Sequence, residues 1–418
     1  MATALDLHDR NGTSHPAQIS PTSPAPVPPT DGETSPEAFP TDETTETVAD
    51  FVDLLEISLS ALNMSPPRYL ASIFGKPRTW LPPYRPFSEY RILNLWRWWR
   101  MWKYLLNVSI PSLPRNPPTF APPFIEQFFF QPSVILQRPD HTGSYTNFPE
   151  ESWFLVNGIM TNDVMAQMNA AFVSYLFHRP VTLIQNSTDS FFYDLAQCMV
   201  GKAWRQATEP AIKAFPVIYD ALQNPHKRRV VILAHSQGTI IMSNVLRLLY
   251  AKVSVPMEAL SATSHAPPEF ILQDESEFDL GDFAELPLKN LTKLEVYCFA
   301  TCADQFTYFD SAAGIKQPYI EHFGNENDLV ARLGMISPRV GDMPLNVEGQ
   351  CYVRPGSWGH FLNEHYLYPI MEKQKHGRKK EGDGTAKPFI RLDHPAGEDT
   401  PFPRLFRYIN GGFRLPVE

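Results

Sequence analysis

The sequence is short of the features that mark several large classes of protein. Four cysteines in 418 residues are too few for a disulfide-built scaffold, and the one close pair, Cys298 and Cys302, has no second pair to complete a zinc site. Apolar runs of about 18 residues are missing, so no membrane-spanning helix is expected. The N-terminus lacks the basic start and the apolar run of a secretory signal.

Positive charge is also scarce. The chain has 36 Lys and Arg residues against 45 Asp and Glu residues, which argues against a nucleic-acid-binding protein. Together these absences predict a cytoplasmic protein in a reducing compartment, not a secreted one, with the surface of a membrane as the alternative location.

Proline and negative charge are concentrated near the N-terminus. Eight of the 41 prolines lie in the first 40 residues, and residues 1–50 hold nine acidic side chains against one basic side chain, Arg10. This segment therefore carries −8 of the total charge of −9 and leaves the rest of the chain nearly neutral. Because it has too little apolar surface to offset its ordering entropy, residues 1–50 are predicted to form a disordered tail.

The remaining chain divides into three parts. Residues 51–150 are predicted to form an N-terminal extension that starts with a helical pattern and contains a Trp- and Arg-rich stretch at 91–106. Residues 151–372 are predicted to form the main folded domain. Residues 373–418 follow as a charged loop and a C-terminal extension.

The central part alternates apolar, strand-like runs with longer helical ones. The expected strands are 153–157, 181–186, 229–234, 294–300, 318–323 and 350–354. The expected helices are 163–177, 210–223, 239–251 and 361–372. Near-continuous apolar strands that alternate with helices are typical of an α/β fold, whose mostly parallel sheet is covered by helices on both faces.

The stretch RRVVILAHSQGTIIMSNVLRLL carries the most specific signal. An apolar strand runs into Ala-His-Ser-Gln-Gly and then directly into a helix, which places Ser236 at the apex of a tight turn. Such a turn exposes a serine hydroxyl above the sheet, and the helix that follows directs its dipole and the Gln237 N–H toward a developing oxyanion. The alternative is a serine that only caps the helix.

This strand–turn–helix resembles the nucleophile elbow of the α/β-hydrolase superfamily, on its lipase and esterase side, with Ala234 where the pattern has its first glycine. The resemblance covers about residues 151–370. It implies an α/β-hydrolase fold and a serine, an acid and a histidine in that order along the chain.

An acid and a histidine follow Ser236 in this order. Asp328 comes after the strand that ends near Phe323, where the superfamily places its acid, and Asp304 is the rival one strand earlier. A helix-capping role is the alternative for Asp328. His360 lies in a Gly-Ser-Trp-Gly loop and can turn toward Ser236.

Two other histidines lie near these positions. His365 is five residues beyond His360, about 140° further around a helix, and is expected to be a packing residue whose loss matters little for turnover. His235, beside the nucleophile, is expected to point away from it and to order the turn.

The second donor of an oxyanion hole is expected in the loop after the first strand of the domain. There Gly158 lets the chain turn, and the N–H of Ile159 or Met160 can donate. An ordinary strand-to-helix turn at Asn157-Gly158 is the alternative.

The Trp- and Arg-rich stretch has two interpretations. On a helical wheel Trp98, Trp99 and Trp102 share one face while Arg97 and Arg100 lie opposite, a pattern that fits a helix at a membrane surface. The same pattern fits a helix packed on the catalytic domain, with arginines stacked on tryptophans.

The expected function is hydrolysis of a carboxylic ester, of a small molecule or a lipid, through an acyl-enzyme on Ser236. His360 transfers the proton, Asp328 orients His360, and no metal or organic cofactor is implied. The resemblance leaves thioesterase and acyltransferase activity open on the same triad. A non-catalytic, membrane-associated scaffold of the same fold is the alternative from another class, and a serine peptidase is a weaker one.

Overall fold

The computed structural model describes most of the central part of the chain and pieces of its flanks. The described residues are 65–76, 81–93, 134–137, 145, 148–158, 161–186, 209–254, 279–303, 306, 318–336, 347–376, 388–392 and 402–413. All of them belong to the second of two units into which the chain divides, Met1–Thr47 and Val48–Glu418. The tail at 1–50, the helix expected at 51–62 and the tryptophans at 96–102 lie outside the described residues.

An eight-stranded, mostly parallel sheet forms the centre of the fold. Its strands, in spatial order, are β1 (Val134–Gln137), β3 (Val181–Asn186), β2 (Glu151–Val156), β4 (Arg229–His235), β7 (Leu294–Phe299), β8 (Tyr319–Asn325), β9 (Gln350–Arg354) and β10 (Ile390–Arg391). The six inner strands are parallel, and the two edge strands pair antiparallel to β3 and to β9.

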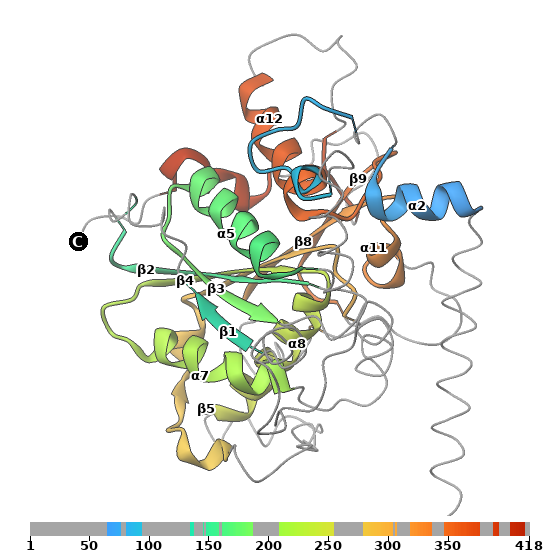
Figure 1. The fold of residues 1–418 in the computed structure, drawn as a ribbon. Helices are drawn as coiled ribbons and strands as arrows, with labels where there is room; N and C mark the ends of the chain where they lie inside the picture. Colours follow the sequence, from blue (N-terminus) through green and yellow to red (C-terminus); the bar gives the residue numbers. More distant parts are fainter. Residues whose placement is uncertain are drawn as a thin grey trace, which may run out of the picture. The chain divides into compact units, whose positions relative to one another are not determined.

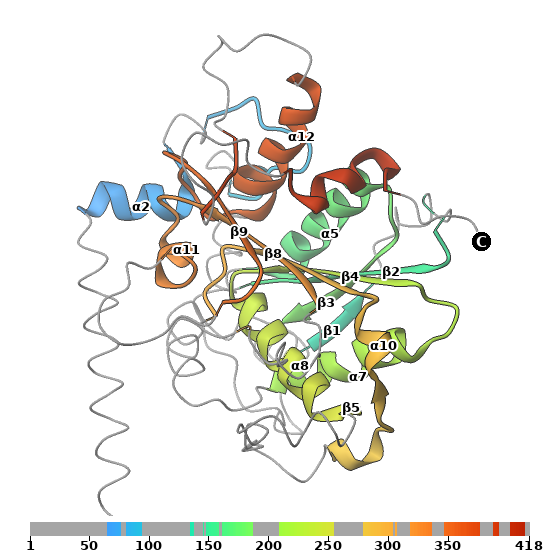
Figure 2. The same cartoon turned by 180° about the vertical axis from the view of Figure 1, so that it is seen from behind.

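Helices cover both faces of this sheet (Figures 1 and 2). On one face lie α5 (Asp163–Phe177) and α12 (Tyr368–His376), and on the other lie α7 (Glu209–Gln223) and α8 (Gln237–Lys252). The predicted α/β class, with a mostly parallel sheet between helical layers, is therefore confirmed.

Smaller elements complete the described part. They are α2 (Pro66–Phe74), η2 (Glu89–Arg91), β5 (Val253–Ser254), η5 (Leu280–Asp282), β6 (Leu286–Pro287), α10 (Leu288–Leu291), α11 (Leu329–Leu333), the π-helix η6 (Leu362–Leu367) and η7 (Arg404–Gly411). Sequence patterning missed the edge strands and α2. The edge strands are too short to show a period, and α2 begins at Pro66 inside proline-rich text, where Pro is tolerated in the first helical turn.

The central strand β4 explains why the apolar runs are continuous. It pairs with β2 on one side and with β7 on the other, and its residues 230–234 have no exposed surface. A strand buried on both faces cannot alternate apolar and polar side chains, so it reads as an unbroken apolar run.

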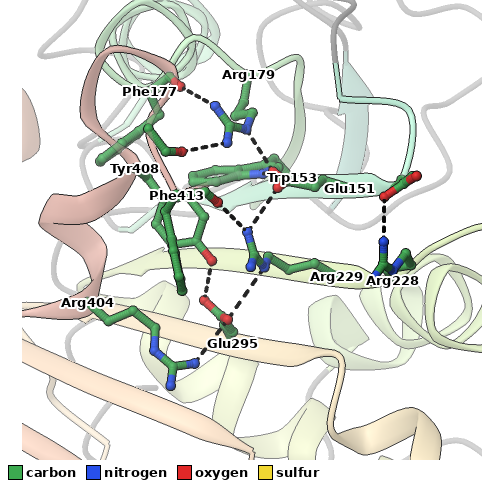
Figure 3. A network of polar contacts seen from close by, with 12 residues as sticks. Glu151, Trp153, Phe177, Arg179, Arg228, Arg229, Glu295, Arg404, Tyr408 and Phe413 are labelled. Carbon is green, nitrogen blue, oxygen red and sulfur yellow. Dashed lines mark hydrogen bonds and ion pairs between the residues drawn. The ribbon is translucent and has the colours of Figure 1, made fainter. Parts of the chain in front are cut away.

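Charged side chains lie buried at the amino-terminal edge of the sheet (Figure 3). Glu151, which begins β2, contacts Arg179 at 2.7 Å and Arg229 at 2.9 Å, and Glu295 on β7 contacts Arg229 at 3.6 Å and Arg404 at 3.1 Å.

The two buried arginines also hold the C-terminal segment. Arg179 donates to the carbonyl of Gly412 and Arg229 to that of Phe413, whose ring lies 4.5 Å from the Arg229 guanidinium. Residues 402–413 of the C-terminal extension are thus part of the packed domain.

Replacing Arg179 with methionine should lower the free energy of unfolding by about 3–5 kcal/mol, because the buried Glu151 carboxylate loses a charged partner. The carbonyls of Phe177 and Gly412 lose their donor as well. Urea unfolding of the variant and of the wild type measures this difference.

Arg228→Met is the matched control. Arg228 pairs with Glu150 at 3.4 Å, but both side chains are substantially exposed, so its loss should cost about 1 kcal/mol or less. Equal losses in the two variants would contradict the structural role of the buried network.

Candidate active site

Ser236 lies at the sharp turn between β4 and α8. Its backbone has φ 56° and ψ −126°, a conformation that residues other than glycine rarely adopt. Such a conformation persists only when the surrounding structure enforces it. The Ser236 N–H donates to the carbonyl of Phe299 at 2.9 Å. Thr239 donates its hydroxyl to the Ser236 carbonyl at 2.7 Å and accepts the Cys302 N–H at 3.2 Å. The turn is therefore tied to the end of β7.

Two glycines near Ser236, Gly238 and Gly158, are required because other parts of the chain approach their Cα atoms closely. A Cβ on Gly238 would lie 2.5 Å from the carbonyl oxygen of Val156, because α8 starts directly against the end of β2. A Cβ on Gly158 would lie 2.4 Å from the Ser236 Cβ and 3.0 Å from its Oγ. Gly158 is thus needed to leave room for the Ser236 side chain, and its φ lies outside the left-handed region that a glycine-dependent turn would use.

Asp328 and His360 are in direct contact. The Nδ1 of His360 lies 3.0 Å and 3.1 Å from the two carboxylate oxygens of Asp328, whose side chain has no exposed surface. Asp328 also caps α11, because its Oδ1 accepts the Val330 N–H at 2.8 Å. The capping and the pairing roles weighed from the sequence therefore coexist in one side chain.

A tyrosine adds a further donor to this carboxylate. The Tyr366 hydroxyl donates to Asp328 Oδ2 at 2.5 Å and accepts the Asn325 N–H at 3.2 Å. Burial, reinforced by the neighbouring Asp328, raises the pKa of Tyr366 well above its ordinary value, so Tyr366 keeps its proton and remains a donor. The buried carboxylate of Asp328 thus accepts hydrogen bonds from a backbone amide, a phenol and an imidazole.

Three of the four polar groups of His360 have defined partners. Its N–H donates to the Ile73 carbonyl at 2.9 Å, its carbonyl accepts from His235 Nε2 at 2.9 Å, and its Nδ1 faces Asp328. The His235 ring lies against the His360 ring, with centroids 4.6 Å apart. His235 therefore supports the loop that carries His360.

The fourth polar group of His360 is Nε2, the ring nitrogen that a histidine uses when it acts as a general base. Among the described residues, neither His360 Nε2 nor Ser236 Oγ has a hydrogen-bond partner, although both atoms are buried. A carboxylate on Nδ1 selects the neutral tautomer whose Nε2 is unprotonated. The site thus contains a buried hydroxyl and a buried proton acceptor, each without a partner in the described part of the chain.

The π-helix that follows His360 begins on a buried glutamate. Glu89 accepts the Asn363 N–H at 2.7 Å and the Glu364 N–H at 3.0 Å. Burial raises the pKa of Glu89 to about 8. Glu89 of the N-terminal extension therefore contacts the π-helix that follows His360 directly.

Some of the site residues predicted from the sequence lie together in the structure, and others lie outside the described residues. The structure brings Asp328 and His360 together and places Gln237 as the first residue of α8, whereas Asp304, Ile159 and Met160 lie outside the described residues. The contacts of Ile73, Tyr90 and Tyr366 with this site were missed. Tyr366 adjoins His365 in the sequence, but no local pattern indicates which way either side chain points.

Comparison with known proteins assigns no relative, since no family model, curated protein or solved structure matches the sequence. Within the described residues, every helix is too short or too polar to cross a lipid bilayer. In the same part of the chain, no group of three or more His, Cys, Asp or Glu side chains is arranged to hold a metal ion.

Three buried histidines stay neutral in the folded protein. Burial lowers the pKa of His235 and His365 well below 6.5 and lowers that of His322 to about 4. In the unfolded chain a histidine takes up a proton below about pH 6.5. Each of these histidines therefore removes stability as the pH falls from its unfolded pKa toward its folded one.

His322→Gln tests this linkage, because glutamine cannot take up the proton. The wild type should be the more stable protein at pH 7.5, and the difference in free energy of unfolding should shrink by about 1 kcal/mol at pH 5.5. Urea unfolding of both proteins at the two pH values measures it. A difference that does not change with pH would show that His322 titrates normally in the native state.

Proposed function

We propose that this protein is a serine hydrolase that cleaves carboxylic esters through a covalent acyl-enzyme. The observation that carries the proposal is the pair of buried, unpartnered atoms Ser236 Oγ and His360 Nε2, combined with the contact between His360 Nδ1 and Asp328. A buried hydroxyl without a partner is costly to maintain, so its retention at a strained turn favours a functional role.

The proposed reaction follows from the roles of these atoms. His360 Nε2 takes the Ser236 proton as Oγ attacks the acyl carbon, and the resulting imidazolium is stabilised by Asp328. His360 then protonates the leaving alcohol, and water hydrolyses the acyl-enzyme by the same transfers in reverse. Tyr366 and Val330 hold Asp328 so that its position does not change during the proton transfer.

Donors for the oxyanion would come from two places. Gln237 opens α8, whose positive dipole end adjoins Ser236. In the loop after β2, Gly158 lies against the Ser236 side chain, which supports the proposal that the next amide, of Ile159, is the second donor.

The topology supports a finer assignment, which we propose as an α/β-hydrolase fold. Ser236, Asp328 and His360 follow β4, β8 and β9 at the same edge of the parallel sheet, in the chain order serine, acid, histidine. Hydrolysis of a carboxylic ester is the simplest reaction for a serine, an acid and a histidine in this arrangement, and thioesters can be cleaved by the same steps.

Labelling with a fluorophosphonate tests the proposal without knowledge of the substrate. The purified wild type should be labelled covalently at Ser236, because the probe reacts with serines that a neighbouring base activates. Ser236→Ala should not be labelled, and His360→Gln should be labelled at least about 1,000-fold more slowly. Mass spectrometry of the labelled peptide identifies the modified residue.

The contrary results are equally specific. A wild type that is not labelled, although folded, would favour the non-catalytic scaffold. Equal labelling of wild type and Ser236→Ala would place the nucleophile elsewhere. If Ser236 is labelled, p-nitrophenyl esters of graded acyl length then measure which chain length gives the highest kcat/KM.

A further inference from the structure

We propose that His365 is a positioning residue for His360, and that Tyr90 and the end of α2 form with it a clamp on the loop at 359–361. The inference rests on the proposed function, because it concerns how the base of that reaction is held. It changes the role expected from sequence spacing, in which His365 is only a packing residue.

The protons of the clamp can be assigned from its partners. The Phe361 N–H points at His365 Nδ1 at 2.9 Å, so Nδ1 must be the acceptor and the proton of the neutral ring lies on Nε2. His365 Nε2 lies 3.1 Å from the Tyr90 hydroxyl oxygen and therefore donates to it. The Tyr90 hydroxyl in turn donates to the Phe74 carbonyl at the end of α2. One directed chain of hydrogen bonds thus runs from the histidine loop to α2.

His365 is suited to this role because it is kept neutral. Its ring is buried, and burial together with the charge of Arg354 lowers its pKa well below the ordinary value. A protonated ring would present a hydrogen on Nδ1 to the Phe361 N–H and break the chain.

Packing fixes the same ring from both sides. Gly359 and Gly75 both have positive φ, and a Cβ on either would lie 2.4 Å from an atom of the His365 imidazole. The Phe361 ring stacks on the imidazole, with centroids 5.5 Å apart and an angle of 11° between the planes. The loop therefore closes tightly around His365.

The clamp acts on His360 through the peptide groups on either side of it. Phe361 follows His360 directly and is held by His365, while the His360 N–H is held by Ile73, one residue before Phe74. A displacement of the base by about 1 Å can cost about 100-fold in rate, so this anchoring has a catalytic consequence. Tyr90 is 275 positions away from His365, and the described residues 65–76 and 81–93 thereby contribute to the active site.

The pair His365→Asn and His365→Leu separates hydrogen bonding from packing. The two side chains have nearly the same shape, but the asparagine oxygen can replace Nδ1 as the acceptor for the Phe361 N–H, whereas leucine cannot. With fluorophosphonate as the probe, the second-order labelling rate of His365→Leu should fall by about 100-fold, while His365→Asn should stay within about 10-fold of wild type.

Tyr90→Phe and Tyr368→Phe provide a second, milder test. Tyr90→Phe removes the hydroxyl that His365 contacts, and the labelling rate should fall by about 10-fold. The Tyr368 hydroxyl accepts the Phe87 N–H at 3.0 Å, so Tyr368→Phe loosens the same N-terminal segment without touching His365. This control should keep the labelling rate within about 2-fold of wild type.

The outcomes distinguish this inference from the proposed function. Absence of labelling in the wild type overturns the proposed function and the inference together. Labelled wild type with equally fast His365→Leu, or with Asn and Leu slowed to the same extent, overturns the inference alone. Thermal unfolding confirms that the variants are folded, and if His365→Leu is not, the comparison of Tyr90→Phe with Tyr368→Phe decides.

Discussion

The hydrogen bond between Asp328 and His360 Nδ1 sets the chemistry that the rest of the site can perform. It places the ring proton on Nδ1 and leaves Nε2 as the acceptor, and it lies in an interior where an unsatisfied carboxylate would be costly. Tyr366 and Val330 satisfy the remaining capacity of that carboxylate. In the proposed reaction, the strained turn at Ser236 depends on this oriented imidazole to take up the serine proton.

The two ends of the sheet differ in whether their buried polar groups have partners. At the amino-terminal edge, Glu151 and Glu295 pair with the buried Arg179 and Arg229 and with the half-buried Arg404, and the C-terminal segment binds to the two buried arginines (Figure 3). At the carboxyl-terminal edge, Ser236 Oγ and His360 Nε2 are left without partners among the described residues. A sheet whose one end is fully satisfied can hold the other end in a geometry that includes strain and unsatisfied polar atoms.

The described N-terminal residues, 65–76 and 81–93, also contact the candidate site. Ile73 binds the backbone of His360, and Glu89 caps the π-helix that follows it. Contacts between residues some 275 positions apart join the two regions, so residues that precede the sheet in the sequence help to hold the segment that carries His360.

The sequence by itself determined the α/β class, the six parallel strands and the order Ser236, Asp328, His360, because buried strands and the strand–turn–helix leave local patterns. It could not determine that Gly158 is required by the Ser236 side chain, that His235 supports His360, or that His365 accepts a hydrogen bond. These features depend on contacts between segments far apart in the chain, and a side chain's direction toward such partners has no local signal. Only the tertiary structure decided them, since hydrogen-bond partners are chosen by the packing that brings the segments together.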